Sequence, residues 1–148
     1  MKKFSKIVLL AAVAFGSLFT ACSTEEPSIV CGRDWNPGSQ VVADTTSEFD
    51  LADQMIVQFR YGKGFDFPKL EIAFYEGTAA NKGKKIWSHE ANVSDKMNVY
   101  TLQGKSKHGG LMTARELTRQ KKPAQVLVEV GDGTKVFVSK ELNLVKNK

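Results

Sequence analysis

The chain has 148 residues, enough for one domain and too few for two of ordinary size. It carries 21 Lys and Arg against 16 Asp and Glu, a net charge of +5, but three of the lysines lie within the first six residues. From residue 22 onward there are 18 basic and 16 acidic side chains, a net charge of +2, so the overall charge does not indicate a nucleic-acid-binding protein.

Residues 1–21 have the pattern of an export signal. Lys2, Lys3 and Lys6 precede an apolar run from Ile7 to Phe19. This run is shorter than the roughly 20 apolar residues that a transmembrane helix needs, and small and polar residues follow it. We therefore predict a targeting segment that is cleaved, with export as the consequence.

The segment Leu18-Phe19-Thr20-Ala21-Cys22 at the end of this run resembles the lipobox of bacterial lipoproteins. The resemblance implies transfer of a diacylglycerol to the Cys22 sulfur, cleavage before Cys22 and, in many cases, acylation of the freed amine. Two or three acyl chains anchor a protein stably in a membrane, whereas one binds only reversibly. The alternative is an ordinary secretory signal that is cut after Ala21.

The residues after Cys22 suggest a location and a tether. Ser23 stands where an aspartate would favour the inner membrane, and Glu25 and Glu26 are similar to the acidic residues of some surface lipoproteins. We therefore expect lipid attachment to the outer membrane or the cell surface. Residues 22–34 are polar and turn-prone, and we expect them to form a tether to one domain at 35–148.

The remainder of the chain shows the period-two hydrophobic pattern of half-buried strands, as in the alternation of Val57 and Phe59 with Gln58 and Arg60. Strands are predicted at about 40–44, 48–51, 55–61, 70–75, 85–92, 98–102, 126–130, 135–138 and 142–145. Gly131-Asp132-Gly133 is typical of a hairpin loop. Short strands separated by turns predict a mainly β fold, an antiparallel β-sandwich of immunoglobulin-like size.

One short helix is expected within this pattern. Thr113-Ala114-Arg115-Glu116 has the form of a capping box, Leu111, Ala114 and Leu117 lie at helical spacing, and Pro123 ends the segment. We expect the helix to cross one end of the sandwich.

The sequence contains no complete catalytic or metal-binding motif. Gly104-Lys105-Ser106 lacks the first glycine of a phosphate-binding loop, and His108-Gly109-Gly110 has no Gly-x-Ser-x-Gly nucleophile to accompany it. Two histidines are too few for the usual catalytic zinc site, and His89, beside Glu90, is expected to face solvent. We expect no metal and no cofactor. With Cys22 lipidated, Cys31 would be either a buried, inert thiol or the site of an intermolecular disulfide.

Two segments are candidates for ligand binding. The first is the glycine-containing connection with Tyr61, Lys63, Phe65 and Phe67, because aromatic residues on loops offer large contact areas to ligands. The alternative is that Phe65 and Phe67 fold back and plug the end of the sandwich.

The second candidate is basic. Arg115 and Arg119 are four residues apart on the expected helix, and Lys122 follows one turn later. The neighbouring Lys105, Lys107 and Lys121 extend the positive charge, which Glu116 alone interrupts. Such a face would suit an anionic glycolipid, anionic lipid head groups or an acidic envelope protein. The alternative is an ordinary solvated helix face.

These patterns favour a non-enzymatic lipoprotein, attached to the membrane by its lipid, that works as a binding or envelope-assembly module and not on nucleic acids. The alternative is a small envelope hydrolase or an inhibitor-type protein whose site is assembled from dispersed residues.

Overall fold

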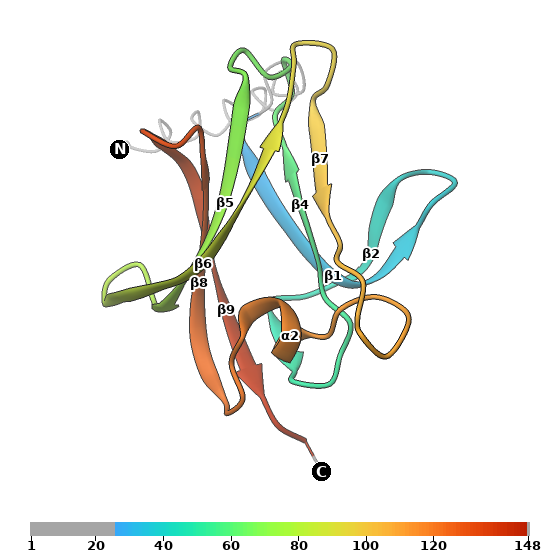
Figure 1. The fold of residues 1–148 in the computed structure, drawn as a ribbon, viewed down its shortest axis with the longest axis vertical. Coiled ribbons are helices and arrows are strands. Elements are labelled where there is room, and N and C mark those ends of the chain that lie inside the picture. Colours follow the sequence, from blue (N-terminus) through green and yellow to red (C-terminus); the bar gives the residue numbers. More distant parts are fainter. Residues whose placement is uncertain (1–25, 148) are drawn as a thin grey trace, which may run out of the picture.

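The computed structural model describes residues 26–147, so the predicted signal peptide and Cys22 lie outside the described residues. Two β-sheets pack face to face and enclose the apolar core (Figure 1). One sheet has four strands in the order β2-β1-β4-β7, and the other has five in the order β3-β9-β8-β5-β6. The β-sandwich with one short helix predicted from the sequence is confirmed.

The four-stranded sheet consists of β1 (Ser28–Asn36), β2 (Val41–Thr45), β4 (Ile56–Arg60) and β7 (Val99–Leu102). The five-stranded sheet consists of β3 (Glu48–Asp50), β5 (Lys69–Gly77), β6 (Lys82–Asn92), β8 (Ala124–Gly131) and β9 (Val136–Val145). Neighbouring strands are antiparallel except β3 and β9, which pair in parallel over three residues. The helix α2 (Ala114–Thr118) lies between β7 and β8 in the chain, and no helix among residues 26–147 is long and apolar enough to cross a membrane.

The first strand begins earlier than the sequence pattern predicts. Residues 28–34, expected to belong to the tether, form most of β1, which pairs with β4 from Ser28 opposite Arg60 to Gly32 opposite Ile56. Only Ile29 and Cys31 face the core in alternation before Gly32 interrupts the pattern, which is too short a signal to identify a strand from sequence. Residues 28–34 therefore belong to the folded domain and not to the tether expected at 22–34.

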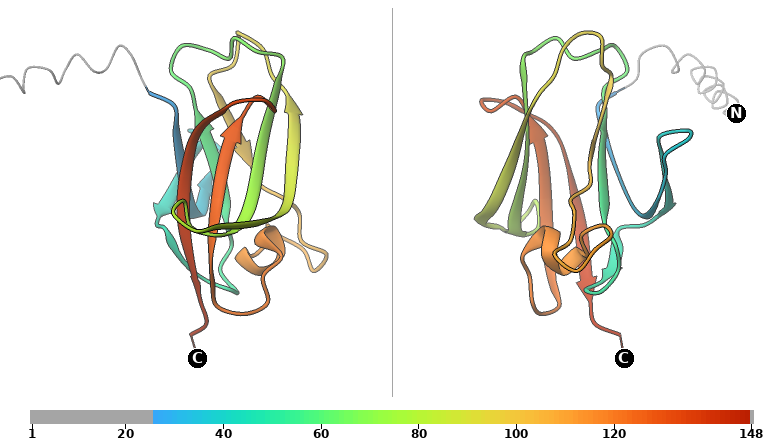
Figure 2. Two further views of the ribbon diagram at one scale, coloured as in Figure 1. Left: turned by 90° about the vertical axis from the view of Figure 1, so that its left-hand side faces the viewer. Right: turned by 45° about the vertical axis from the view of Figure 1, so that its right-hand side comes forward.

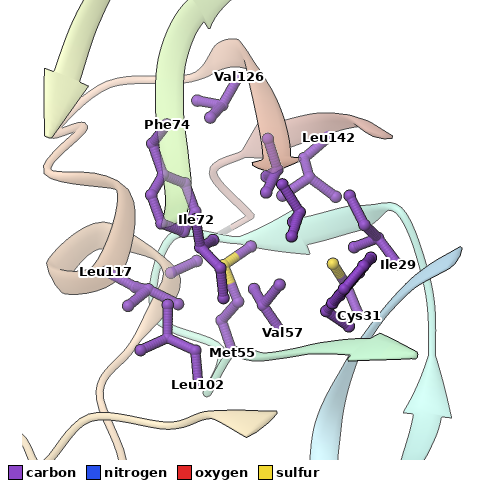
Figure 3. Close-up of a cluster of buried hydrophobic side chains, with 14 of the residues drawn as sticks. Ile29, Cys31, Met55, Val57, Ile72, Phe74, Leu102, Leu117, Val126 and Leu142 are labelled. Atoms are coloured by element: carbon purple, nitrogen blue, oxygen red, sulfur yellow. The ribbon is translucent and has the colours of Figure 1, made fainter. Parts of the chain in front are cut away.

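The inward faces of the two sheets supply the core (Figure 3). Val57 comes from β4, Ile72 and Phe74 from β5, and Val126 from β8, and all four side chains are fully buried. Burying an aliphatic or aromatic side chain of this kind contributes about 1.5–3 kcal/mol. The strands predicted at 135–138 and 142–145 form one continuous strand, β9, whose Leu142 completes this cluster.

The sandwich has two different ends. Ser28 pairs with Arg60, and Arg60 pairs with Val99, so the start of β1 lies beside the connections 61–68 and 93–98. We call this the loop end. The connection 103–123, which contains α2, lies at the opposite end of the sandwich together with the end of β9, and we call this the helix end (Figures 1 and 2).

Candidate functional site

The aromatic residues of the 61–68 connection close the loop end instead of projecting from it. Phe65 is 1% exposed and Tyr61 is 9% exposed, while Phe67 is half-buried against the core. The ring centroid of Phe65 lies 5.8 Å from that of Phe59 and 5.6 Å from that of Phe67. The rings of Tyr61 and Phe65 are therefore covered by protein, and ligand binding by these two residues stays a prediction. Their packing agrees with the alternative, in which aromatic rings of this connection plug the end of the sandwich.

Hydrogen bonds between backbones hold this plug in place. Tyr61 donates to the carbonyl oxygen of Asn98 at 2.8 Å, and Phe65 donates to that of Met97 at 2.9 Å. Gly64 has a φ of +87°, and an added Cβ there would lie 2.8 Å from the carbonyl oxygen of Asp95. Only glycine fits such a close approach without displacing the neighbouring loop. The two connections at the loop end therefore form one packed unit.

Of the four residues proposed in this connection, Lys63 is the one that stays exposed. Its ammonium group lies 3.8 Å from a carboxylate oxygen of Asp66 and 5.4 Å from the ring centroid of Tyr61. An exposed ion pair of this kind contributes little to stability. Phe67 also lines a surface hollow with Pro68, Val93 and Asp95, which lies beside the plug.

At the other end of the sandwich, α2 begins as predicted. The Thr113 hydroxyl accepts a hydrogen bond from the Glu116 backbone at 3.2 Å, and the Glu116 carboxylate accepts one from the Thr113 backbone at 3.3 Å. The second carboxylate oxygen of Glu116 accepts a hydrogen bond from the Ser106 hydroxyl at 2.9 Å. Glu116 therefore holds the helix and the preceding connection together.

The helix ends earlier than expected. Arg119 has a φ of 59°, in the left-handed region, and the last helical residue is Thr118. The indole nitrogen of Trp87, on β6, donates to the Leu117 carbonyl oxygen at 2.6 Å, in the position that a further helical turn would need. The prediction that Arg115, Arg119 and Lys122 share one helix face is therefore wrong, because only Arg115 lies on the helix.

The basic residues nevertheless remain at one end of the molecule. Arg119 is placed over Trp87, with its guanidinium carbon 4.8 Å from the ring centroid, and Trp87 stacks on Phe74 at 5.5 Å. The exposed cations of the 103–123 connection, which we call the basic cap, are Lys105, Lys107, Arg115, Arg119, Lys121 and Lys122. The ion pairs found among residues 26–147 are formed by basic residues outside the cap. None of these ion pairs therefore neutralises a positive charge of the cap.

The two histidines lie in different environments and do not meet. The Nε2 atom of His89 lies 2.7 Å from the Tyr100 hydroxyl and so joins β6 to β7, the neighbouring edges of the two sheets. His89 is thus half-buried instead of facing solvent beside Glu90, which pairs with Lys69 at 3.7 Å. Within residues 26–147 no three His, Cys, Asp or Glu side chains are arranged to hold a metal ion.

Cys31 lies in the core of the sandwich at 1% exposure (Figure 3). Burial raises the pKa of the Cys31 thiol to about 12, against a smaller opposite effect of Lys140. Because the thiolate is the reactive form, a thiol with this pKa is inert at neutral pH. The burial agrees with the expectation of an inert thiol.

One group of charged residues could not be found from the sequence. The β5–β6 hairpin folds across the outer face of the five-stranded sheet (Figure 2), and Ala79 at its tip donates to the Glu141 carboxylate at 3.0 Å. On the same sheet, Lys85 pairs with Glu71 at 3.1 Å and Lys82 pairs with Glu129 at 3.0 Å. The pairing of β5 with β6 also contains register shifts, which no sequence pattern specifies.

No family model and none of the curated proteins matches this chain. Among solved structures, it is similar to an immunoglobulin-like protein from Pseudomonas aeruginosa at 14% sequence identity and a TM-score of 0.45. The match covers 82% of this chain and 98% of the other.

Proposed function

We propose that this chain is a lipoprotein of the bacterial envelope, held on the outer membrane or the cell surface by lipid on Cys22, where it acts as a non-enzymatic binding or assembly module. The observation that carries the proposal is the lipobox-like segment Leu18-Phe19-Thr20-Ala21-Cys22 after the apolar run, and the position of β1 determines how the domain would sit on the membrane. The strand starts at Ser28, so only five residues separate the lipobox cysteine from the folded sandwich. Six peptide steps span at most about 20 Å, which keeps the loop end close to the membrane surface.

This short connection also gives the domain a preferred direction. The ten residues of β9 rise about 3.3 Å each, so the sandwich is about 33 Å long, more than the reach of the tether. An upright sandwich therefore presents its helix end, with the basic cap, away from the membrane that holds the lipid. Electrostatic attraction across that distance is weak, because the Debye length is about 8 Å at physiological ionic strength.

We favour binding over hydrolysis because the carboxylates that line a surface hollow form ion pairs. Glu71 and Glu129 line a hollow on the five-stranded sheet, and each forms an ion pair with a lysine. A glycosidase needs one carboxyl group that is protonated and one that is free to act as a base or a nucleophile. An ion pair with lysine favours the charged carboxylate, so neither residue is placed for the role of protonated acid.

Metabolic labelling with palmitate tests the anchor. The full-length chain expressed in its own host should incorporate label and sediment with membranes, whereas Cys22→Ala should incorporate none. Cys31→Ala is the matched control, because Cys31 is buried in the core and should not affect labelling. Labelling of Cys22→Ala at the level of the unchanged chain would overturn the proposal.

A further inference from the structure

We infer that the basic cap is a docking surface for an acidic segment of another envelope protein. Its six exposed cations all belong to the connection 103–123 at the helix end. The single acid within this connection, Glu116, uses both carboxylate oxygens in hydrogen bonds with Thr113 and Ser106. The cap therefore carries positive charge that the domain's own acids leave available.

Asp50, a second acid near the cap, already accepts hydrogen bonds from backbone groups of the domain. Asp50 accepts backbone hydrogen bonds from Ala52 at 2.8 Å and Asn147 at 2.6 Å, and these bonds, with a smaller contribution from the charge of Arg115, hold the pKa of Asp50 below its ordinary value. Asp50 forms no ion pair with Arg115 among the described residues. Arg115 is therefore free of a direct ion pair with this neighbouring acid within residues 26–147.

Arg119, one of these cations, is held in position by contacts within the domain. Arg119 lies over the Trp87 ring, whose indole nitrogen donates to the Leu117 carbonyl and which stacks on Phe74. A guanidinium held in this way loses less conformational freedom on binding than a free side chain does. Arginine and tryptophan are also the residues most enriched at the centres of protein interfaces.

The shape of this surface favours a macromolecule over a small anion. The six cations are distributed along the connection from Lys105 to Lys122. Charges distributed in this way suit an extended acidic chain, whereas a free phosphate would need converging donors. The cap also points away from the anchoring membrane, a placement that rests on the proposed function, so the lipid head groups of that membrane are not the favoured ligand.

Binding of fluorescent poly-L-glutamate to the full chain, measured by anisotropy, tests the inference. The variant Arg115→Gln/Arg119→Gln/Lys122→Gln should bind about tenfold or more weakly at low ionic strength, and the loss should shrink at 1 M salt, where the Debye length is about 3 Å. The matched control, Lys69→Gln/Lys96→Gln/Lys135→Gln, removes three charges at the loop end and should bind as the unchanged chain does.

Three outcomes would overturn the inference. Equal affinity losses in the two triple variants would show attraction by net charge alone, and no loss in the cap variant would exclude the cap. Tighter binding of the unchanged chain to polyphosphate or to anionic vesicles than to poly-L-glutamate would assign the surface to phosphate groups instead. The Cys22→Ala chain should bind poly-L-glutamate normally, so failure of the anchor and failure of the docking surface are distinguishable.

Discussion

Replacing Phe65 by alanine should destabilise the domain strongly, because the ring is part of the plug at the loop end. Phe65 is 1% exposed and stacks within 6 Å of Phe59, Tyr61 and Phe67. A buried Phe→Ala change costs about 3–5 kcal/mol, from lost burial and from the cavity that remains. Since a domain is stable by only about 5–15 kcal/mol, this is a large part of the total.

Urea unfolding of residues 23–148, followed by tryptophan fluorescence, measures the effect. With a urea dependence of about 1–3 kcal/mol/M, a loss of 4 kcal/mol lowers the midpoint by about 1–4 M. Lys63→Ala is the control in the same connection, because its exposed side chain should change stability by about 0.5 kcal/mol or less. A cost below about 1 kcal/mol for Phe65→Ala would refute the plug and return the connection to its role as an exposed binding loop.

Three further predictions concern the core and the helix. Trp87→Phe keeps an aromatic ring against Phe74 but leaves the Leu117 carbonyl without its donor, so thermal unfolding should show a loss of about 1–3 kcal/mol. Cys31 should resist iodoacetamide in the folded chain and react once the chain is unfolded in urea. Because its pKa rises from 9.0 in the unfolded chain to about 12 in the folded one, the unfolded state loses its proton first, and stability should fall as pH increases from about 9 towards 12. This fall should be shallower in Cys31→Ala, and equal pH profiles would contradict the burial of the thiol.

The parts of the fold that could be predicted from sequence are those whose signal is local. Val57 with Phe59 and Ile72 with Phe74 alternate at period two because each strand has one face on the core. The capping box at Thr113 is equally local, since both of its hydrogen bonds lie within four residues. These signals are sufficient to predict the sandwich class and the start of the helix.

The remaining features depend on partners that are distant in sequence. The end of α2 requires Trp87, thirty residues before Leu117, to reach that carbonyl, and no local pattern around Arg119 indicates this. The place of β1 at the centre of a sheet depends on pairing with β4, not on its own short alternation. Burial of Phe65 likewise depends on the 93–98 connection, so loop aromatics alone do not distinguish a plug from a binding site.

The most direct test of the proposed anchor is the intact mass of the protein extracted from membranes of its own host. We expect a chain that begins at Cys22 and carries a diacylglycerol on the sulfur, with or without a further acyl chain on the amine. Digestion should place the whole added mass on the N-terminal peptide and leave the peptide with Cys31 unmodified. A mature chain that begins at Cys22 without lipid, or one that retains residues 1–21, would contradict the account.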